Sequence, residues 1–166
     1  MASTPKTATT TPAKKAAATR AKDAIALLKA DHAEVKQCFK DYQKLVDSEA
    51  DADMRQPLAQ KICALLTVHA TIEEEIFYPA ARELLEDDAS LVDEADVEHA
   101  SAKDLIAQIE SMDADDDLYD AKVKVLGEYI DHHVQEEQDE MFPKLKEAGM
   151  DTKAIGEKLL ARKETL

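Results

Sequence analysis

Two eleven-residue segments, HATIEEEIFYP at residues 69–79 and HVQEEQDEMFP at residues 133–143, align without a gap and decide the fold. Each begins with a histidine, carries a glutamate at its fifth position and ends in a proline that follows an aromatic residue. His32 stands 37 residues before the first segment, and His99 stands 34 residues before the second. The chain therefore contains two similar halves, each with one histidine followed by a His-x-x-x-Glu pair.

Apolar residues recur at every third or fourth position around these segments, which predicts amphipathic helices. We expect Pro79 to end or kink its helix, because a proline ring clashes with the carbonyl four residues back. Four long helices with short connections predict an all-α, up-down-up-down four-helix bundle with a short extra C-terminal helix. The predicted helices cover about 23–47, from near Pro57 to Pro79, 90–112, 118–142 and, after an N-cap at Asp151, 151–163.

The first 22 residues differ from the rest in composition. They contain five lysines and arginines and no acid, and they are mostly alanine, threonine, serine and proline. They lack the continuous apolar stretch of a secretory signal, and we favour a flexible basic tail over an acid-poor transit peptide. The expected organisation is this tail at 1–22 and one bundle domain at 23–166, with its core at 23–148 and its last short helix at 151–163.

Charge and length narrow the classes of function. The 166 residues carry a formal net charge of -15 and a sequence pI of about 4.7. Such a surface repels phosphate backbones and anionic lipid, so we expect neither nucleic acid nor a membrane as a partner. No apolar run approaches the ~18 residues of a membrane span. Cys38 and Cys63 are too few for a disulfide framework, which favours a reducing, cytoplasmic location.

The histidines indicate the chemistry. Each of the four long helices places one histidine on its apolar face, and two of these have a glutamate one turn further on. Four buried imidazoles without partners would cost several kcal/mol, and a metal supplies a shared partner. Six ligands are too many for one tetrahedral ion, whereas carboxylates can bridge two first-row ions. The candidate ligands of this dinuclear centre are His32, His69, Glu73, His99, His133 and Glu137.

The fourth helix offers a second histidine. His132 stands five residues before Glu137, and His133 stands four before it. The internal repeat favours His133, and so does the helix face, since His132 sits about 100° away around the helix. His132, Glu74 and Glu136 remain further candidates for open metal positions.

This combination of motifs resembles the hemerythrin-like, or HHE cation-binding, family. The resemblance covers about residues 23–148 and includes the opening AIALLKADHAEV and the flanks EEEIFYP and EEQDEMFP. It implies a cofactor of two non-haem iron ions, oxo- or hydroxo-bridged. It also implies small-molecule partners such as dioxygen, peroxide or nitric oxide, with activities that range from oxygen binding to iron or oxygen sensing.

One position departs from the oxygen carriers of that family. They have a histidine four residues after the one that matches His99, and Lys103 stands there in this chain. Two six-coordinate irons have twelve coordination positions. With Lys103 in place of that histidine, two of these positions remain open, against one in a five-histidine site. More open positions favour chemistry on small ligands. Among the tyrosines, Tyr78 beside Pro79 is the one that could face the site.

We therefore expect a di-iron protein that binds or reacts with dioxygen or hydrogen peroxide. Weak catalase-like or oxidase activity stays open at this point. The alternatives are an iron- or oxygen-sensing regulatory module without turnover, and a metal-free bundle whose core histidines are all hydrogen-bonded.

Overall fold

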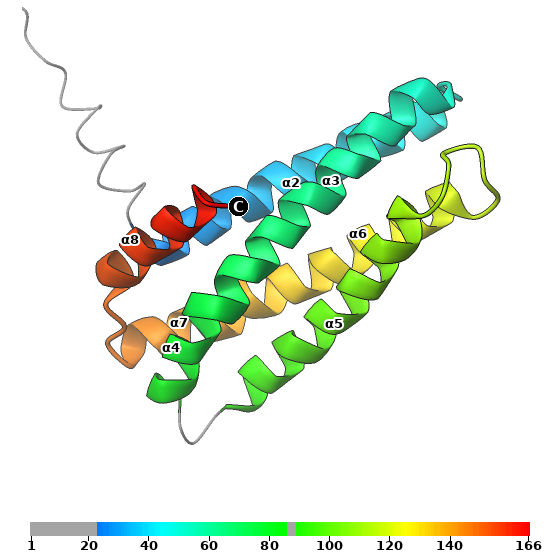
Figure 1. The fold of residues 1–166 in the computed structure, drawn as a ribbon. Coiled ribbons are helices and arrows are strands. Elements are labelled where there is room, and N and C mark those ends of the chain that lie inside the picture. Colours follow the sequence, from blue (N-terminus) through cyan, green and yellow to red (C-terminus); the bar gives the residue numbers. More distant parts are fainter. Residues whose placement is uncertain (1–22, 86–88) are drawn as a thin grey trace, which may run out of the picture.

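The computed structural model describes residues 23–85 and 89–166, so the expected tail at residues 1–22 lies outside the described residues. Its four long helices pack antiparallel (Figure 1), which confirms the predicted all-α bundle. A π-helical turn and a short helix extend the second and fourth of them, and a last helix follows. The elements are α2 (Ala24–Asp47), α3 (Ala52–Ile72), η1 (Glu73–Phe77), α4 (Tyr78–Leu84), α5 (Ser90–Glu110), α6 (Tyr119–Glu136), η3 (Glu137–Met141), α7 (Phe142–Glu147) and α8 (Thr152–Lys163).

The second long helix begins earlier than predicted. Helix α3 starts at Ala52, so Pro57 lies within the helix instead of at its start. The first turn is closed without Pro57, because the amide of Arg55 donates to the carbonyl of Asp51. The guanidinium of Arg55 also donates to the Ala50 carbonyl and to Asp120 of α6. These contacts hold the first turn of α3 to the preceding residues and to α6.

Pro79 does not end its helix, but the regular α-helix is interrupted by a π turn just before it, and the same happens before Pro143. Pro79 and Pro143 each follow a π-helical turn and occupy the second position of a short α-helix. In the first turn the amide of Tyr78 donates to the carbonyl of Glu73, five residues back. A π turn is wider than an α turn, and we attribute the tolerance of the proline ring to this extra width. The second turn repeats the bond between Phe142 and Glu137.

The π turn also changes which residues face the core. A regular α-helix would carry the apolar face from Ile72 to Ile76, as the periodicity predicts. Instead Phe77 and Tyr78 are buried and Ile76 is only half-buried. The inserted residue rotates the following helix and brings Tyr78 onto the face that Glu73 occupies.

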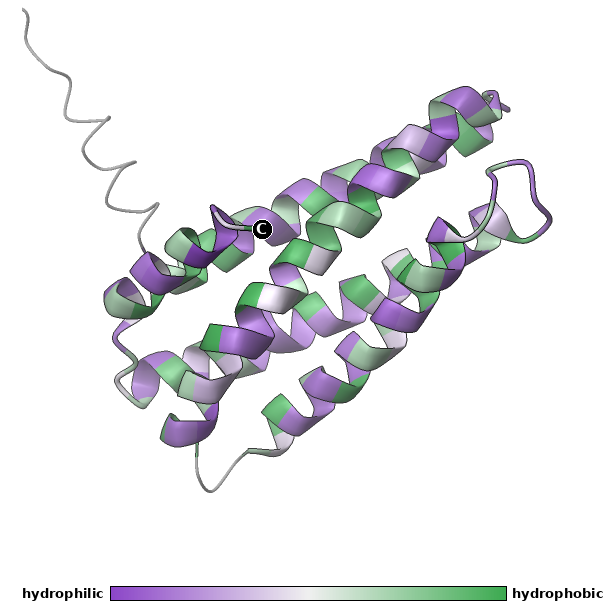
Figure 2. Cartoon of the chain, in the orientation of Figure 1, coloured by the Kyte–Doolittle hydropathy of each residue, from purple (hydrophilic) through white to green (hydrophobic). Residues whose placement is uncertain are grey.

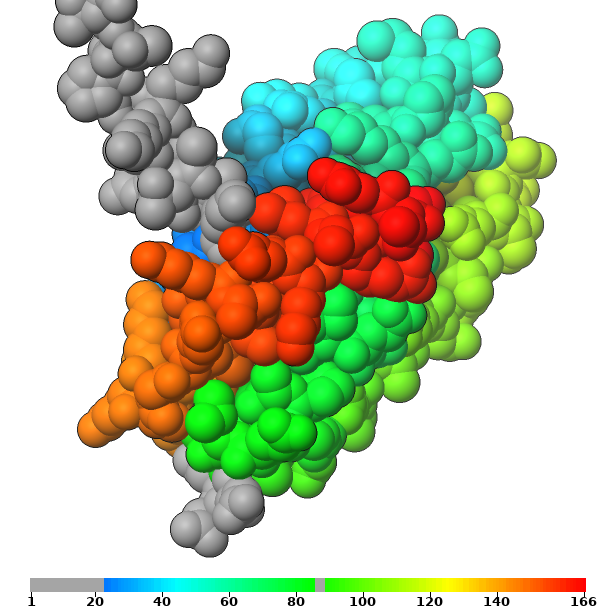
Figure 3. All heavy atoms as spheres, turned by 60° about the vertical axis from the view of Figure 1, so that its left-hand side comes forward, coloured from blue at the N-terminus to red at the C-terminus, as the bar shows by residue number. Residues whose placement is uncertain are grey.

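The core consists of two apolar clusters with a polar layer between them. Along each long helix and its extension the histidine lies between a residue of one cluster and a residue of the other, as His32 does between Leu28 and Val35. Along the helices, hydrophobic residues alternate with hydrophilic ones (Figure 2). Helix α8 lies against α2, α3 and the η1 turn (Figure 3). No helix in the described ranges is both long and apolar enough to cross a membrane.

Candidate metal centre

The structure brings together all six residues that the sequence singled out as principal ligands. The four histidines come one each from α2, α3, α5 and α6, and each glutamate is the first residue of a π turn. All are buried in the middle of the bundle, with the carboxylates 0% and 1% exposed. The six are His32, His69, Glu73, His99, His133 and Glu137.

The imidazoles form two pairs. The Nε2 atoms of His32 and His69 lie 3.0 Å apart, and those of His99 and His133 lie 3.1 Å apart. Each pair comes from one half of the chain. Two nitrogens about 2.1 Å from the same ion and at right angles to each other would be separated by about 3.0 Å. Both pairs therefore have the spacing of two neighbouring ligands on one metal ion.

Each carboxylate lies between one imidazole of each pair. The Oε2 atom of Glu73 is 3.2 Å from His69 Nε2 and 3.5 Å from His99 Nε2. The Oε2 atom of Glu137 is 3.2 Å from His32 Nε2 and 3.7 Å from His133 Nε2. Both carboxylates thus connect the two halves, in the positions that bridging ligands between two ions require.

Glu73 supplies the test of whether a metal fits. In the described part of the chain neither of its carboxylate oxygens has a hydrogen-bond partner, although the side chain is fully buried. Its Oε2 atom has the imidazole nitrogens of His69 and His99 nearby. A buried carboxylate without hydrogen bonds is costly, and a cation removes that cost. Imidazole and carboxylate donors together suit first-row metal ions. The cluster is therefore consistent with a dimetal site.

When no ion is bound, the carboxylates favour protons on neighbouring imidazoles such as His69. Burial by itself would raise the pKa of Glu137, but the His32 hydrogen bond and the nearby imidazoles lower it to about 2. Burial would lower the pKa of His69, but the Glu73 carboxylate beside it raises that pKa to about 10. Metal ions would take the place of these protons, because a ligating imidazole must be neutral.

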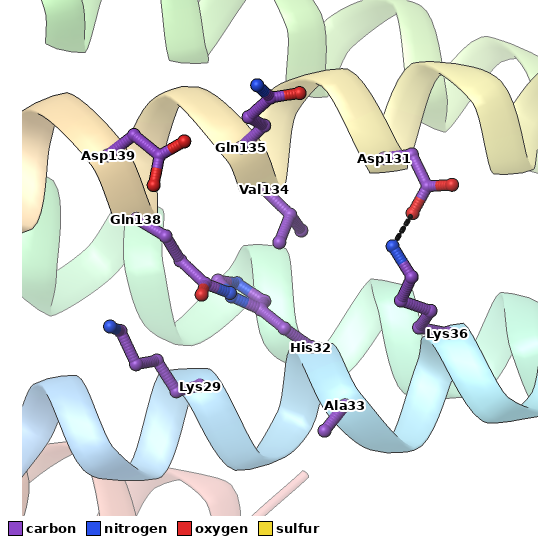
Figure 4. Close-up of a pocket in the computed structure, with 9 residues that line it drawn as sticks. All are labelled: Lys29, His32, Ala33, Lys36, Asp131, Val134, Gln135, Gln138 and Asp139. Carbon is purple, nitrogen blue, oxygen red and sulfur yellow. Dashed lines mark hydrogen bonds and ion pairs between the residues drawn. The ribbon is translucent and has the colours of Figure 1, made fainter.

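The outward-facing nitrogen of each imidazole has a polar neighbour, which orients Nε2 toward the centre. These outer neighbours occupy equivalent positions in the two halves of the chain. Asp31 and Glu98 each directly precede a histidine that is a predicted ligand, and Glu74 and Gln138 each directly follow a glutamate that is one. The sequence reading did not assign them this role. The Nδ1 distances are 3.0 Å from His32 to Gln138 (Figure 4), 3.5 Å from His69 to Asp31, 3.0 Å from His99 to Glu74 and 2.7 Å from His133 to Glu98.

The three further candidates face away from the centre. His132 is 63% exposed and lies 3.3 Å from Glu136 on the outer surface of α6. Glu74 is held beside His99 by the ammonium of Lys103, which donates to it at 2.6 Å. Lys103 therefore occupies the position of the missing fifth histidine but forms an ion pair with Glu74.

Tyr78 is the residue that reaches the centre in addition to the six. Its hydroxyl donates to Glu137 Oε1 at 3.0 Å and lies 3.2 Å from His99 Nε2. Burial, together with the charge of Glu73, raises the pKa of Tyr78 well above its usual value and keeps the phenol protonated. The residue at the same place in the second half is Phe142, which stacks on His32 with ring centroids 6.1 Å apart.

A small cavity adjoins the imidazoles. It measures about 20 Å³ and is lined mainly by apolar side chains, among them Val35, Leu66, Ala102, Ile106 and Ile130. A cavity of roughly 10–15 Å³ holds one water-sized molecule. The space is therefore large enough for about one water-sized molecule.

A bundle with two buried imidazole pairs joined by two carboxylates defines a metal-binding helical protein. The family model of the hemerythrin HHE cation binding domain matches residues 23–145, and the chain belongs to this family. A crystal structure of a hemerythrin HHE cation binding domain-containing protein from Mycobacterium kansasii has the same fold. It matches with a TM-score of 0.69 and 24% identity over 86% of each chain. Comparison with curated protein sequences gives no match.

Proposed function

We propose that this chain is a cytoplasmic non-haem di-iron protein that binds or reacts with dioxygen or hydrogen peroxide. The observation that carries the proposal is the pair of buried carboxylates, each placed between the two imidazole pairs. One iron would be held by His32 and His69 and the other by His99 and His133, with Glu73 and Glu137 shared. When bound, the irons supply redox and Lewis-acid chemistry toward small oxygen species.

The surrounding residues support reaction over simple storage of metal. The apolar cavity admits a small neutral molecule beside the imidazoles and leaves little room for bulk water. Lys103 and Glu74 pair with each other, so neither fills a metal position. The hydroxyl of Tyr78 donates to Glu137 and lies beside the Nε2 atoms of His99 and His133, so it places one polar group on that side of the cluster.

Metal content tests the first part of the proposal. Protein produced in iron-replete medium should contain two irons per chain, and Glu73→Gln should reduce that number. Glu75→Gln is the matched control, because Glu75 is the next but one residue, is exposed and pairs with Arg162. A reproducible content near one iron, or equal iron in both variants, would contradict the shared-carboxylate assignment.

Reactivity tests the second part. We expect the reduced protein to be oxidised irreversibly by dioxygen and to consume hydrogen peroxide slowly, measured by stopped-flow absorption and by peroxide loss. A regulatory module without turnover would bind iron but leave peroxide intact. Full return to the reduced form after oxygen is removed would identify a carrier instead.

A further inference from the structure

A second group of metal-ligating side chains lies outside the inner cluster. His132 Nε2 is 3.3 Å from Glu136 Oε1 on the same helix and 3.6 Å from Glu98 Oε1 on α5. One oxygen of Glu98 faces this group, and the other lies 2.7 Å from His133 Nδ1. The three ligand atoms lie within 4.8 Å of one another. One imidazole and two carboxylates from two helices thus converge at the surface.

The equivalent positions in the first half of the chain carry different residues. By the internal repeat, Glu98 corresponds to Asp31, whereas His132 and Glu136 correspond to Val68 and Ile72. On that half Lys163 of α8 donates to Asp31 at 2.6 Å and balances its charge.

Of the two halves, as far as the described residues go, the second therefore combines the repeated carboxylate position with two more ligand side chains. Among the described residues, Glu98 pairs with histidines and with no lysine or arginine. His132 remains 63% exposed, so solvent and ions can reach the group.

We propose that Glu98, His132 and Glu136 bind a divalent metal ion at an outer site that is separate from the inner cluster. Two carboxylates and one imidazole, with the remaining positions left to water, suit zinc, manganese or ferrous iron. Calcium is disfavoured because it takes six to eight oxygen ligands. The net charge of -15 favours the approach of any cation. The inner cluster need not contain metal for this site to form.

Zinc titration of the full chain tests the site. Iron-loaded protein is dialysed against increasing zinc, and bound zinc is measured by elemental analysis, while the imidazole resonances of His132 are followed by NMR. Glu128→Gln is the matched control, because it removes one exposed carboxylate from the same helix. We expect one zinc ion that perturbs the His132 signals in the starting protein and in this control.

In His132→Ala and Glu136→Gln that zinc ion should bind at least about tenfold more weakly, since loss of a neighbour outside the first ligand shell already costs roughly 10–100-fold. The iron content of both variants should stay unchanged, which shows that the inner cluster is intact. Equal zinc binding in His132→Ala and the control would overturn the proposal. So would zinc binding without any change at His132. Should the inner cluster prove free of metal, the His132-dependent zinc ion would still identify the outer site.

Discussion

The hydroxyl of Tyr78 makes the two halves of the centre unequal, and its removal tests how the metal-free cluster is held together. Tyr78→Phe deletes the hydrogen bond to Glu137 Oε1, at 3.0 Å, between side chains that are both 1% exposed. A hydrogen bond to a buried charged group contributes about 1.5–3 kcal/mol to the free energy of unfolding. In a protein of this size 1 kcal/mol shifts Tm by about 2–4 °C. The Tm of the metal-free variant should therefore fall by about 3–12 °C.

The corresponding substitution in the second half, Phe142→Tyr, should change Tm in the opposite direction. By the repeat, residue 142 is placed toward Glu73 as Tyr78 is toward Glu137, and Glu73 Oε1 has no hydrogen-bond partner among the described residues. Phe142→Tyr should therefore supply the missing donor and raise the Tm of the metal-free protein. Combining it with Tyr78→Phe should bring Tm back toward the starting value.

The assay is thermal unfolding of chelator-treated protein, followed by circular dichroism. Tyr129→Phe serves as the control, because this tyrosine is 50% exposed and should leave Tm within about 1 °C, as surface changes usually do. If Tyr78→Phe unfolds at the same temperature as this control, the hydroxyl does not stabilise the Glu137 carboxylate and the reasoning is refuted.

Three more predictions concern the ligands themselves. His133→Ala should lose iron from the inner cluster, whereas His132→Ala should keep it, and the reverse result in elemental analysis would mean that α6 is rotated. The pKa of His69 is raised from 6.5 to about 10, so the metal-free protein has this stabilisation below pH 6.5 and loses it as pH rises toward 10. The free energy of unfolding of the metal-free protein, measured with urea, should fall between pH 6.5 and about pH 10. A free energy that does not change with pH over this range would contradict the prediction. Lys103→His should lengthen the lifetime of an oxygen adduct in stopped-flow mixing, provided that its imidazole reaches the metal, and it should leave the iron content unchanged.

Helical periodicity was enough to predict the bundle and to bring six side chains to one layer. His132 and His133 differ by one step of about 100°, and that step separates an exposed side chain from a buried one. Periodicity could not locate the π turns, because an inserted residue changes the phase of everything after it. Tyr78 reaches the centre although it stands five residues after Glu73. In a regular α-helix of about 3.6 residues per turn, side chains five residues apart do not share a face.

Other features depend on contacts between distant segments. The first turn of α3 is tied to α6 by the hydrogen bond from Arg55 to Asp120, which no local pattern around Pro57 reveals. The outer neighbours of the imidazoles were present in the repeat, since Asp31 and Glu98 occupy equivalent positions. Their role becomes visible only when the Nδ1 atoms are placed against residues from the adjacent helix.

The near-symmetry of the two halves has a consequence for how such a centre could be assembled. Two copies of a single helical hairpin, related by a twofold axis, would present the same histidines and the same carboxylates. Every residue in that dimer would occur twice, so both metal positions would have identical surroundings. Joining the hairpins in one chain removes this restriction. It allows Tyr78 to stand opposite Phe142 and Glu74 opposite Gln138, and it gives each metal position an environment that can vary independently of the other.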